Sequence, residues 1–470
     1  MIESELQKYL HGPKAVEGLR IIQRLRDAGF IAYFAGGCVR DALLGRTPKD
    51  YDVATDATPD AVRELFGKRR TLAFGASFGV IGVLPDKSHS DKSHWSTDPA
   101  DESGGMTQPD SSSVAKKNPE PKKNPEPKKN PEQLHAAVEP TEVATFRSDG
   151  HYSDGRRPDT VHFGDARNDA IRRDFTINGL FYDPQEGKVI DHVGGREDLA
   201  ARVLRTIGSP EQRFGEDRLR MLRAIRFAAT LQFGIHAETL HAIQQHADGI
   251  CDVSGERIGA EMRRILASPH AFDGLQQMLQ SGLARVVLPE LVDVDMKRLE
   301  RFLHHAQPRS FSLSLACLGA ADLEQELDVR IGNLQQISQR WRLSTLESRQ
   351  AEAAIKHWKT LVHADSVLWS MVQPVLVLRE APYVLGLAEA ITNAENLDRD
   401  GCELAKRALG WPAERLDPQP LLSGGDLMAL GFRPGPEFGK ALAKLRIRQL
   451  DGEITTRDQA IAALNALGLD

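Results

Sequence analysis

The stretch FAGGCVRDALLGRTPKDYDVAT, residues 34–55, constrains the fold of this chain more than any other part of the sequence. An apolar run that ends at Phe34 indicates a buried strand, and the Gly36-Gly37 pair after it indicates a tight turn. The residues after the turn have the composition of a short helix, and KDYDVAT at 49–55 that of a second strand. The pattern therefore predicts a small α/β unit.

Two carboxylates of this segment have the spacing of a metal site. Residues two apart on a strand point to the same face, so Asp50 and Asp52 can share a divalent cation. Magnesium is commonly held by one or two carboxylates together with substrate phosphates. The Gly36-Gly37 turn leaves room for phosphate oxygens, and the free N–H groups of the following helix favour anions. These features predict a triphosphate cradle beside a magnesium site, as nucleotidyl transfer requires.

A third carboxylate is expected on a later strand of the same unit. FGVIGVLP at 78–85 and TEVATF at 141–146 both have strand character, and Glu142 stands on the second of them. We expect Glu142 to help bind the metal that activates the attacking hydroxyl. The alternative is an acid on an edge strand without a catalytic role.

Between those two strands the composition changes abruptly. Residues 86–135 contain a Ser/Asp/Gly-rich stretch and then KKNPEP, KKNPEP and KKNPEQ in tandem. Such residues cannot bury enough apolar area to offset chain entropy, so disorder is the expected state. An expansion at the tip of a hairpin is the simpler interpretation, and a lysine-bearing tether that touches RNA is the alternative.

The segment RRDFTINGLFYD at 172–183 combines buried apolar positions with polar ones. Its aromatic and aliphatic residues are expected to be buried, which leaves Arg173, Asp174 and Asn178 as polar groups. Arginine suits a phosphate contact, and Asp or Asn can hydrogen-bond a ribose hydroxyl. The alternative is a structural turn held by salt bridges.

The segment EDRLRMLRAIRFA at 216–228 has helical periodicity. Asp217 and Arg220 are three residues apart, so we expect them to be neighbours on one helix face, where an ion pair is the common meaning of such spacing. Arginines in and just before the segment predict a positive surface for a nucleic-acid backbone, although the formal net charge of the chain is −6. They are Arg213, Arg218, Arg220, Arg223 and Arg226.

The remaining sequence is helical in pattern and long enough for several domains. At 470 residues the chain exceeds one ordinary domain, and beyond about residue 200 it carries few strand signals. Four widely spaced cysteines without a CxxC pair, and an N-terminus without an apolar core, favour a cytoplasmic protein. No apolar run approaches the length of a membrane span.

These segments, in this order, resemble bacterial tRNA nucleotidyltransferases, the class II branch of the poly(A) polymerase and CCA-adding enzyme family. The resemblance covers about residues 13–268 and resumes with LSGGDLMALGFRPGPEFGK at 422–440, which looks like the tail of CCA-type enzymes. It implies a polymerase-beta-like α/β nucleotidyltransferase head followed by an all-α neck, body and tail. The implied boundaries are 1–184 for the head with its insert at 86–135, 185–268 for the neck, 269–400 for the body and 401–470 for the tail.

The resemblance also implies an activity and its site residues. The reaction would be Mg²⁺-dependent transfer of CMP and AMP from CTP and ATP to the 3′ end of tRNA. Asp50 and Asp52 would bind the metal, with Glu142 as the third catalytic acid. The nucleotide-binding residues would be Gly36, Gly37 and Arg40 on the triphosphate side, Arg173, Asp174 and Asn178 for phosphate and sugar, and Glu216, Asp217, Arg220 and Arg223 around the base.

Three alternatives stay open at this point. A poly(A) polymerase shares every motif of the head, although the tail argues against it. An enzyme that adds only the terminal A is a second possibility, since some organisms divide the work between CC-adding and A-adding enzymes. YSDGRRPDTVHF at 152–163 resembles the flexible loop associated with adding the terminal A, which argues against an enzyme that adds only CC. A non-catalytic RNA-binding protein of the same fold is the third, and the intact acidic and basic motif residues weigh against it.

Overall fold

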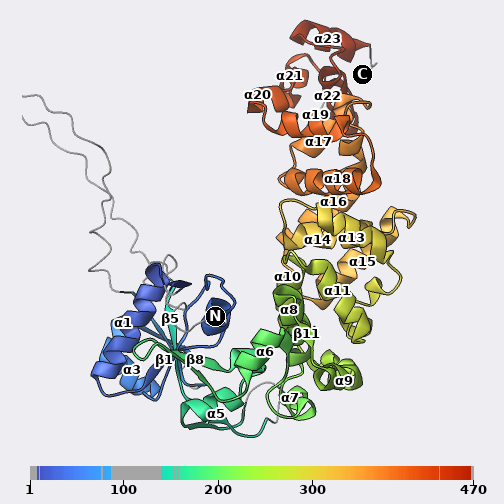
Figure 1. Cartoon of the computed structure of the whole chain (residues 1–470). Helices are drawn as coiled ribbons and strands as arrows, with labels where there is room; N and C mark the ends of the chain where they lie inside the picture. The colour runs from blue at the N-terminus through green and yellow to red at the C-terminus, as the bar shows by residue number, and fades with distance from the viewer. Residues whose placement is uncertain are drawn as a thin grey trace, which may run out of the picture. The chain divides into compact units, whose positions relative to one another are not determined.

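The computed structural model describes residues 8–9, 11–75, 78–85, 139–152, 155, 158–432 and 435–466. The chain divides into two compact units, and Figure 1 traces their elements in chain order. The first unit comprises Met1–Gly150, Thr160–Arg173 and Ile177–Gly195, and the second comprises His151–Asp159, Asp174–Thr176 and Arg196–Asp470. The predicted insert and part of the predicted loop at 152–163 lie outside the described residues.

The first unit is built on a seven-stranded mixed sheet of strand order β3-β4-β5-β2-β1-β8-β9. Strands β2 and β5 are parallel, and the other neighbouring strands are antiparallel. The strands are β1 (Ala32–Ala35), β2 (Val53–Thr55), β3 (Thr71–Gly75), β4 (Val80–Val83), β5 (Thr141–Thr145), β8 (Leu180–Asp183) and β9 (Lys188–Asp191). A separate hairpin pairs β6 (Arg147–Asp149) with β7 (Val161–Phe163). The predicted α/β unit is therefore present.

Helices cover both faces of this sheet. Phe34 of β1 lies against α1, where the missing side chain of Gly18 makes room, since a Cβ there would lie 2.6 Å from the Phe34 ring. On the other face, Ala54 and Phe181 form a buried cluster with Ala170 of α5. The helices of this unit are α1 (Pro13–Asp27), α2 (Gly37–Leu43), α3 (Pro59–Phe66) and α5 (Ala166–Ile171), followed by α6 (Gly195–Ala201) at the unit boundary.

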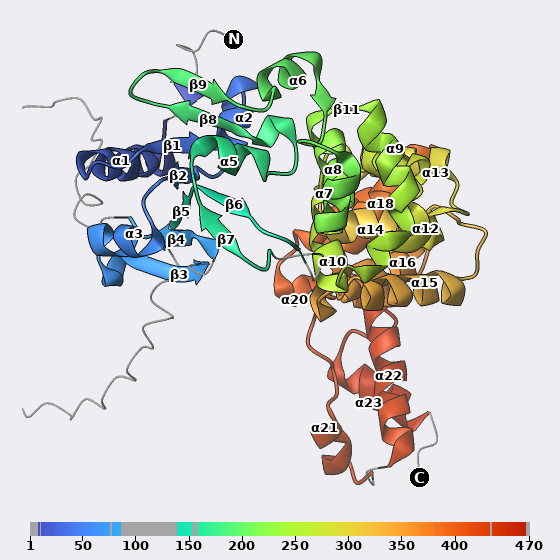
Figure 2. The same cartoon turned by 90° about the horizontal axis from the view of Figure 1, so that it is seen from below.

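The second unit is almost entirely helical, as the sequence predicts. Figure 2 shows its last three helices, α21 to α23, gathered at one end of this unit. Its helices are α7 (Pro210–Glu216), α8 (Leu219–Leu231), α9 (Ala237–His246), α10 (Gly255–Leu266), α11 (Ala271–Gln280), α12 (Ala284–Val287), α13 (Met296–His305), α14 (Phe311–Ala320), α15 (Leu327–Arg340), α16 (Thr345–Val362), α17 (Trp369–Leu376), α18 (Ala381–Glu395), α19 (Asp400–Leu409), α20 (Ala413–Leu416), α21 (Gly424–Ala429), α22 (Pro436–Leu450) and α23 (Arg457–Asn465). A short parallel pair joins β10 (Val203–Leu204) to β11 (Gly234–Ile235).

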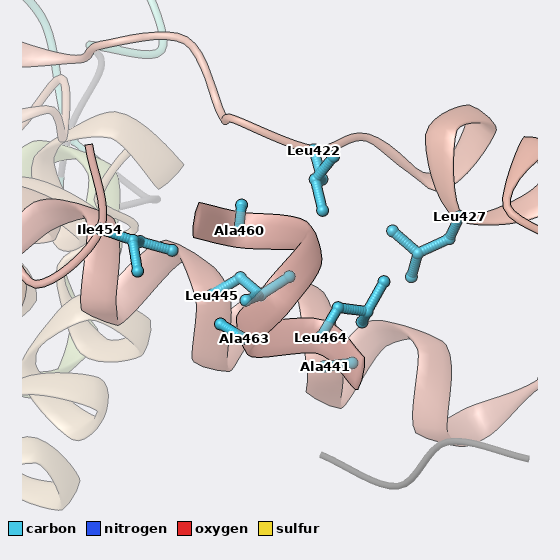
Figure 3. Packing of buried hydrophobic residues seen from close by; sticks show 8 residues of the cluster. All are labelled: Leu422, Leu427, Ala441, Leu445, Ile454, Ala460, Ala463 and Leu464. Carbon is cyan, nitrogen blue, oxygen red and sulfur yellow. The ribbon is translucent and has the colours of Figure 1, made fainter. Parts of the chain in front are cut away.

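The end of the second unit has a small hydrophobic core of its own. Figure 3 shows side chains from α21, α22 and α23 pointing toward one another, with Leu427, Ala460 and Leu464 fully buried. The buried residues of this core are Leu422, Leu427, Ala441, Leu445, Ile454, Ala460, Ala463 and Leu464. No helix within the described residues is both long and apolar enough to cross a membrane.

Candidate active site

Three carboxylates that the sequence singles out line one pocket of the first unit. Asp50, Asp52 and Glu142 border a pocket of about 410 Å³. The parallel pairing of β2 with β5 sets Val53 opposite Val143, so the residues just before them, Asp52 and Glu142, are also neighbours. The other lining residues are Lys14, Tyr51, Glu139, Pro140 and Thr141.

The two aspartates precede strand β2 instead of lying on it. The strand begins at Val53, although the Ala35 amide still donates to the Asp52 carbonyl oxygen at 3.0 Å and extends the pairing by one residue. The side chain between the aspartates, Tyr51, packs its ring edge-on against Phe34, with 5.8 Å between ring centroids. The expected alternation therefore holds outside the strand, and the expected element boundary is wrong.

Negative charge is concentrated in this pocket. Desolvation by the surrounding protein atoms, together with the nearby Glu142 carboxylate, raises the pKa of Asp52 to about 6. The Arg173 guanidinium group has the opposite, smaller effect. A cation already lies at the rim, where the Lys14 ammonium donates to Asp50 at 2.8 Å and to Glu139 at 2.6 Å. Both hydrogen bonds raise the pKa of Lys14, and the bond to Asp50 has the larger effect. The pocket therefore suits a positive ion.

The donor set fits magnesium only together with outside ligands. Among the described residues, no three His, Cys, Asp or Glu side chains converge into a complete metal site. Magnesium does not need one, because it keeps several waters and takes further ligands from substrate phosphates. Hard carboxylate oxygens with excess negative charge are the ligands this ion prefers, so the residues present fit it.

The Gly36-Gly37 pair begins helix α2, as the sequence predicts. Gly36 is the N-cap residue, with φ 70° and ψ −120°, a conformation open almost only to glycine. A Cβ at this position would lie 2.6 Å from Nη1 of Arg173, so the glycine also makes room for that guanidinium group. At Gly37, by contrast, a Cβ would meet only Nη2 of Arg40, at 3.8 Å.

Replacing Gly36 with alanine is expected to lower both stability and activity. The left-handed backbone strain costs about 1–3 kcal/mol, and the displaced Arg173 loses its position beside the pocket. Thermal unfolding of the variant measures the first effect, and nucleotide incorporation measures the second. Gly37→Ala is the matched control for the change in stability, because its backbone is helical and its Cβ has space. Equal losses of stability in the two variants would contradict the assignment.

A buried acid holds the arginines of the RRDFT segment. Asp169, which is fully buried, accepts hydrogen bonds from Arg172 and from Arg173, the latter at 2.9 Å. Burial alone would raise the pKa of Asp169, but the Arg173 and Arg172 guanidinium groups hold it below its usual value. Arg173 also donates to the carbonyl oxygen of Asn178 at 3.1 Å. Arg173 is thus fixed on the face of the sheet that carries Asp52.

Arg40 and Asn178 form a second fixed pair in the first unit. Both side chains are buried, and Nη1 of Arg40 donates to the Asn178 side-chain oxygen at 2.7 Å. The Nε group of Arg40 donates to Asp41 at 2.8 Å. The two residues that sequence analysis assigns to the triphosphate and the sugar therefore support each other.

Asp174 belongs to the second unit, although it directly follows Arg173 in the chain. Its carboxylate accepts from Nε of Arg223 at 2.9 Å and from the Phe175 amide at 2.8 Å. Although burial favours the neutral form of Arg223, the Asp174 carboxylate outweighs that effect and raises its pKa. Glu261 lies on the far side, 3.9 Å from Nη1 of Arg223.

The expectation that Asp217 and Arg220 share a helix face is wrong. Helix α7 ends at Glu216, Asp217 is its C-cap residue with extended backbone, and α8 begins only at Leu219. The Asp217 carboxylate accepts from Arg257 of α10 at 2.7 Å. Arg220 pairs instead with Glu216, the last residue of α7, across the break between the two helices. The helix break between the two residues is the physical reason for the difference.

Four residues that contact the predicted ones or line the same pocket were not expected from the sequence. They are Lys14, Glu139, Asp169 and Arg257. Each lies far in the sequence from at least one of its partners or outside the segments with recognisable motifs. For Asp169, which lies in the DARNDA segment just before the RRDFT segment, there is one local signal. An acid three or four residues before an arginine on a helix commonly forms an ion pair with it.

Comparisons with known proteins agree with this geometry. The Poly A polymerase head domain matches residues 32–120 and 106–205, and the probable RNA and SrmB-binding site of polymerase A matches residues 232–294. A CCA-adding enzyme of Levilactobacillus brevis is 30% identical over 465 residues, which cover 96% of this chain and 98% of the relative. This chain belongs to the CCA-adding enzyme family.

Other family members support the assignment over different lengths. A CCA-adding enzyme of Geobacillus stearothermophilus is 36% identical over 272 residues, which cover 58% of this chain and 54% of that protein. The crystal structure of the Bacillus stearothermophilus CCA-adding enzyme in complex with CTP matches with a TM-score of 0.71 and 25% identity, over 97% of this chain and 98% of the other. The Thermotoga maritima CCA-adding enzyme complexed with tRNA shares the fold, with a TM-score of 0.59 and 17% identity, over 98% of both chains.

Family membership confirms the fold class that the sequence predicts. The mixed sheet is that of a nucleotidyltransferase head, and a mostly helical part follows it. The prediction that the chain is an enzyme of the nucleotidyltransferase class is confirmed as well.

Proposed function

We propose that this CCA-adding enzyme family member transfers CMP and AMP from CTP and ATP to the 3′ end of tRNA, without a nucleic-acid template. The meeting of Asp50, Asp52 and Glu142 in one pocket carries the proposal, because a non-catalytic RNA-binding protein has no use for clustered acids there. The Levilactobacillus brevis relative, which matches over 98% of its length, is a CCA-adding enzyme, and the Bacillus stearothermophilus structure was solved in complex with CTP. Both observations support the same substrates.

Asp50 and Asp52 are the proposed magnesium ligands, and Glu142 is the proposed third acid. Bound magnesium would supply activation of the attacking hydroxyl and neutralisation of charge at the transferred phosphate. The carboxylates themselves hold negative charge on one side of the pocket, where Asp52 is kept in place by the pairing of β2 with β5. Tyr51 packs into the core between them and fixes their common direction.

The remaining residues of the head are proposed to bind the triphosphate and the sugar. The glycine turn at Gly36 brings backbone, without a side chain, close to Arg173. Asp169 orients that guanidinium group, whose remaining hydrogen-bonding capacity suits phosphate oxygens. Arg40 and Asn178, already bonded to each other, are the proposed groups for the triphosphate and the ribose.

Base selection is proposed for residues of the second unit. Asp217 and Arg220 remain the proposed pair that reads the base, with Glu216 and Arg223 beside them. Each of the two has a protein partner in the structure, Arg257 for Asp217 and Glu216 for Arg220. To bind the base, Asp217 and Arg220 must either use hydrogen-bonding positions that these partners leave open or exchange the partners for the nucleotide.

The helical part is proposed to bind tRNA, and the whole enzyme is proposed to be cytoplasmic. The head at 1–184, neck at 185–268, body at 269–400 and tail at 401–470 remain the proposed domains, and the tail has its own hydrophobic core. All four cysteines lie in the described part of the chain, and none forms a disulfide. Free cysteines are typical of a reducing compartment.

Three tRNA transcripts test the proposal, ending before CCA, after C and after CC. Each is incubated with CTP, ATP or both, and the products are separated on a sequencing gel. CCA addition predicts completion of all three transcripts to the same length when both nucleotides are present. An enzyme that adds only the terminal A extends only the transcript ending in CC, a poly(A) polymerase adds long ladders with ATP alone, and a binding protein extends none.

A further inference from the structure

We propose that Lys14 is a built-in competitor of the metal ion, which holds Asp50 in the metal-free enzyme and must release it before a divalent cation binds. The residue has no place in the motifs that sequence analysis singled out. The inference rests on the proposed metal role of Asp50 and Asp52. Its consequence is that one lysine outside the catalytic set determines how much magnesium the enzyme needs.

The lysine has a complete set of hydrogen bonds in this position. Its ammonium group donates to Asp50 at 2.8 Å, to Glu139 at 2.6 Å and to the carbonyl oxygen of Lys49 at 3.1 Å. An ammonium group has three N–H donors, so every one of them has an acceptor. All but the Lys49 carbonyl belong to the lining of the same pocket. Lys14 therefore lies at the metal site and not merely near it.

A divalent cation and the Lys14 ammonium compete for the negative charge of Asp50, whose Oδ1 accepts from the lysine. Magnesium approaches its oxygen ligands to 2.0–2.1 Å, and an ammonium group hydrogen-bonded to the same carboxylate would then lie within a few ångströms of it. At such separations like charges repel strongly, and water screens them only in part. Binding of the metal is thus coupled to departure of the lysine.

The ion pair between Lys14 and Asp50 is exposed to solvent and can therefore break at little cost. The side chain of Lys14 is 49% exposed and that of Asp50 is 75% exposed, and exposed ion pairs of this kind are weak. Lys14 also stands in the first turn of α1, where the helix dipole disfavours a positive charge. Once Asp50 binds a metal, the ammonium keeps only its bonds to Glu139 and to the Lys49 carbonyl oxygen, and the ion pair with Glu139 is exposed as well. A lysine that served only to tie two segments together would be better placed away from a helix N-terminus.

The test measures the affinity of the full chain for Mn²⁺ at pH 8 in the absence of nucleotide. Electron paramagnetic resonance reports how much of the Mn²⁺ is bound. We expect Lys14→Met to bind Mn²⁺ about two- to fivefold more tightly than the unchanged enzyme, the range expected when one exposed ion pair is removed. Lys14→Arg keeps the competing charge and should stay near the unchanged affinity. Lys68→Met, at an exposed lysine of the same unit, is the matched control and should change nothing.

The outcomes separate this inference from the proposed function. Equal or weaker Mn²⁺ binding by Lys14→Met, with the protein shown to be folded by its thermal unfolding curve, overturns the role of Lys14 alone. Absence of Mn²⁺ binding by the unchanged enzyme, or unchanged binding by Asp52→Asn, overturns the metal assignment and this inference with it. Tighter binding by Lys14→Met but not by Lys14→Arg supports it.

Discussion

Asp52→Asn is expected to abolish nucleotide addition while tRNA binding stays close to that of the unchanged enzyme. The substitution keeps the shape of the side chain and removes the charge that a metal ligand needs, so transition-state stabilisation worth several kcal/mol is lost. The affinity for tRNA should come mainly from arginines and lysines that contact phosphates, many of which lie in the helical unit. Single-turnover incorporation of labelled CTP and a filter-binding assay measure the two quantities separately.

Asp60→Asn is the matched control for this experiment. Asp60 is an exposed aspartate in the first turn of α3. The same chemical change there removes only the small stabilisation that a negative charge gives to a helix N-terminus. It should retain addition within about twofold, because surface substitutions usually change stability by less than 0.5 kcal/mol. Near-normal turnover by Asp52→Asn would remove Asp52 from the metal site. Loss of tRNA binding in parallel with activity would indicate a folding defect instead.

The part of the site that sequence analysis predicts well depends on short-range rules. Alternation along an extended segment puts Asp50 and Asp52 on one side, and it holds although strand β2 begins only at Val53. The glycine turn and the helix after it follow from the backbone freedom of Gly36. Such features need no knowledge of distant contacts.

The part that sequence analysis misses depends on long-range contacts or on a broken helix. Helical spacing predicts a contact between Asp217 and Arg220 only if the helix is continuous, and it ends at Glu216. The actual partner of Asp217, Arg257, is 40 residues away and comes from α10. Likewise, Lys14 reaches Glu139 across the insert, and nothing in either local sequence predicts that pair.

Asp217→Ala is expected to lose CTP and ATP addition and to relax discrimination against UTP. Cytosine and adenine both present an amino donor beside an unprotonated ring nitrogen, so a carboxylate and a guanidinium group can serve both bases. Uracil and guanine present a carbonyl beside a ring N–H, which would face the carboxylate and Arg220 with the wrong groups. A good base-edge pair discriminates by about 1–3 kcal/mol, so the CTP-to-UTP ratio should fall by about fivefold to 150-fold.

The pairing of Asp217 with Arg257 decides how this experiment must be controlled. Asp217→Ala also leaves Arg257 without its partner, so part of any loss could be structural. Asp252→Ala removes another aspartate that pairs with an arginine of the same unit, Arg218, and should keep both activity and nucleotide preference. Arg257→Met removes the partner and leaves the carboxylate. If Asp217 reads the base, Arg257→Met retains a preference for CTP over UTP that Asp217→Ala has lost. If both variants keep the unchanged ratio, Asp217 is only the partner of Arg257.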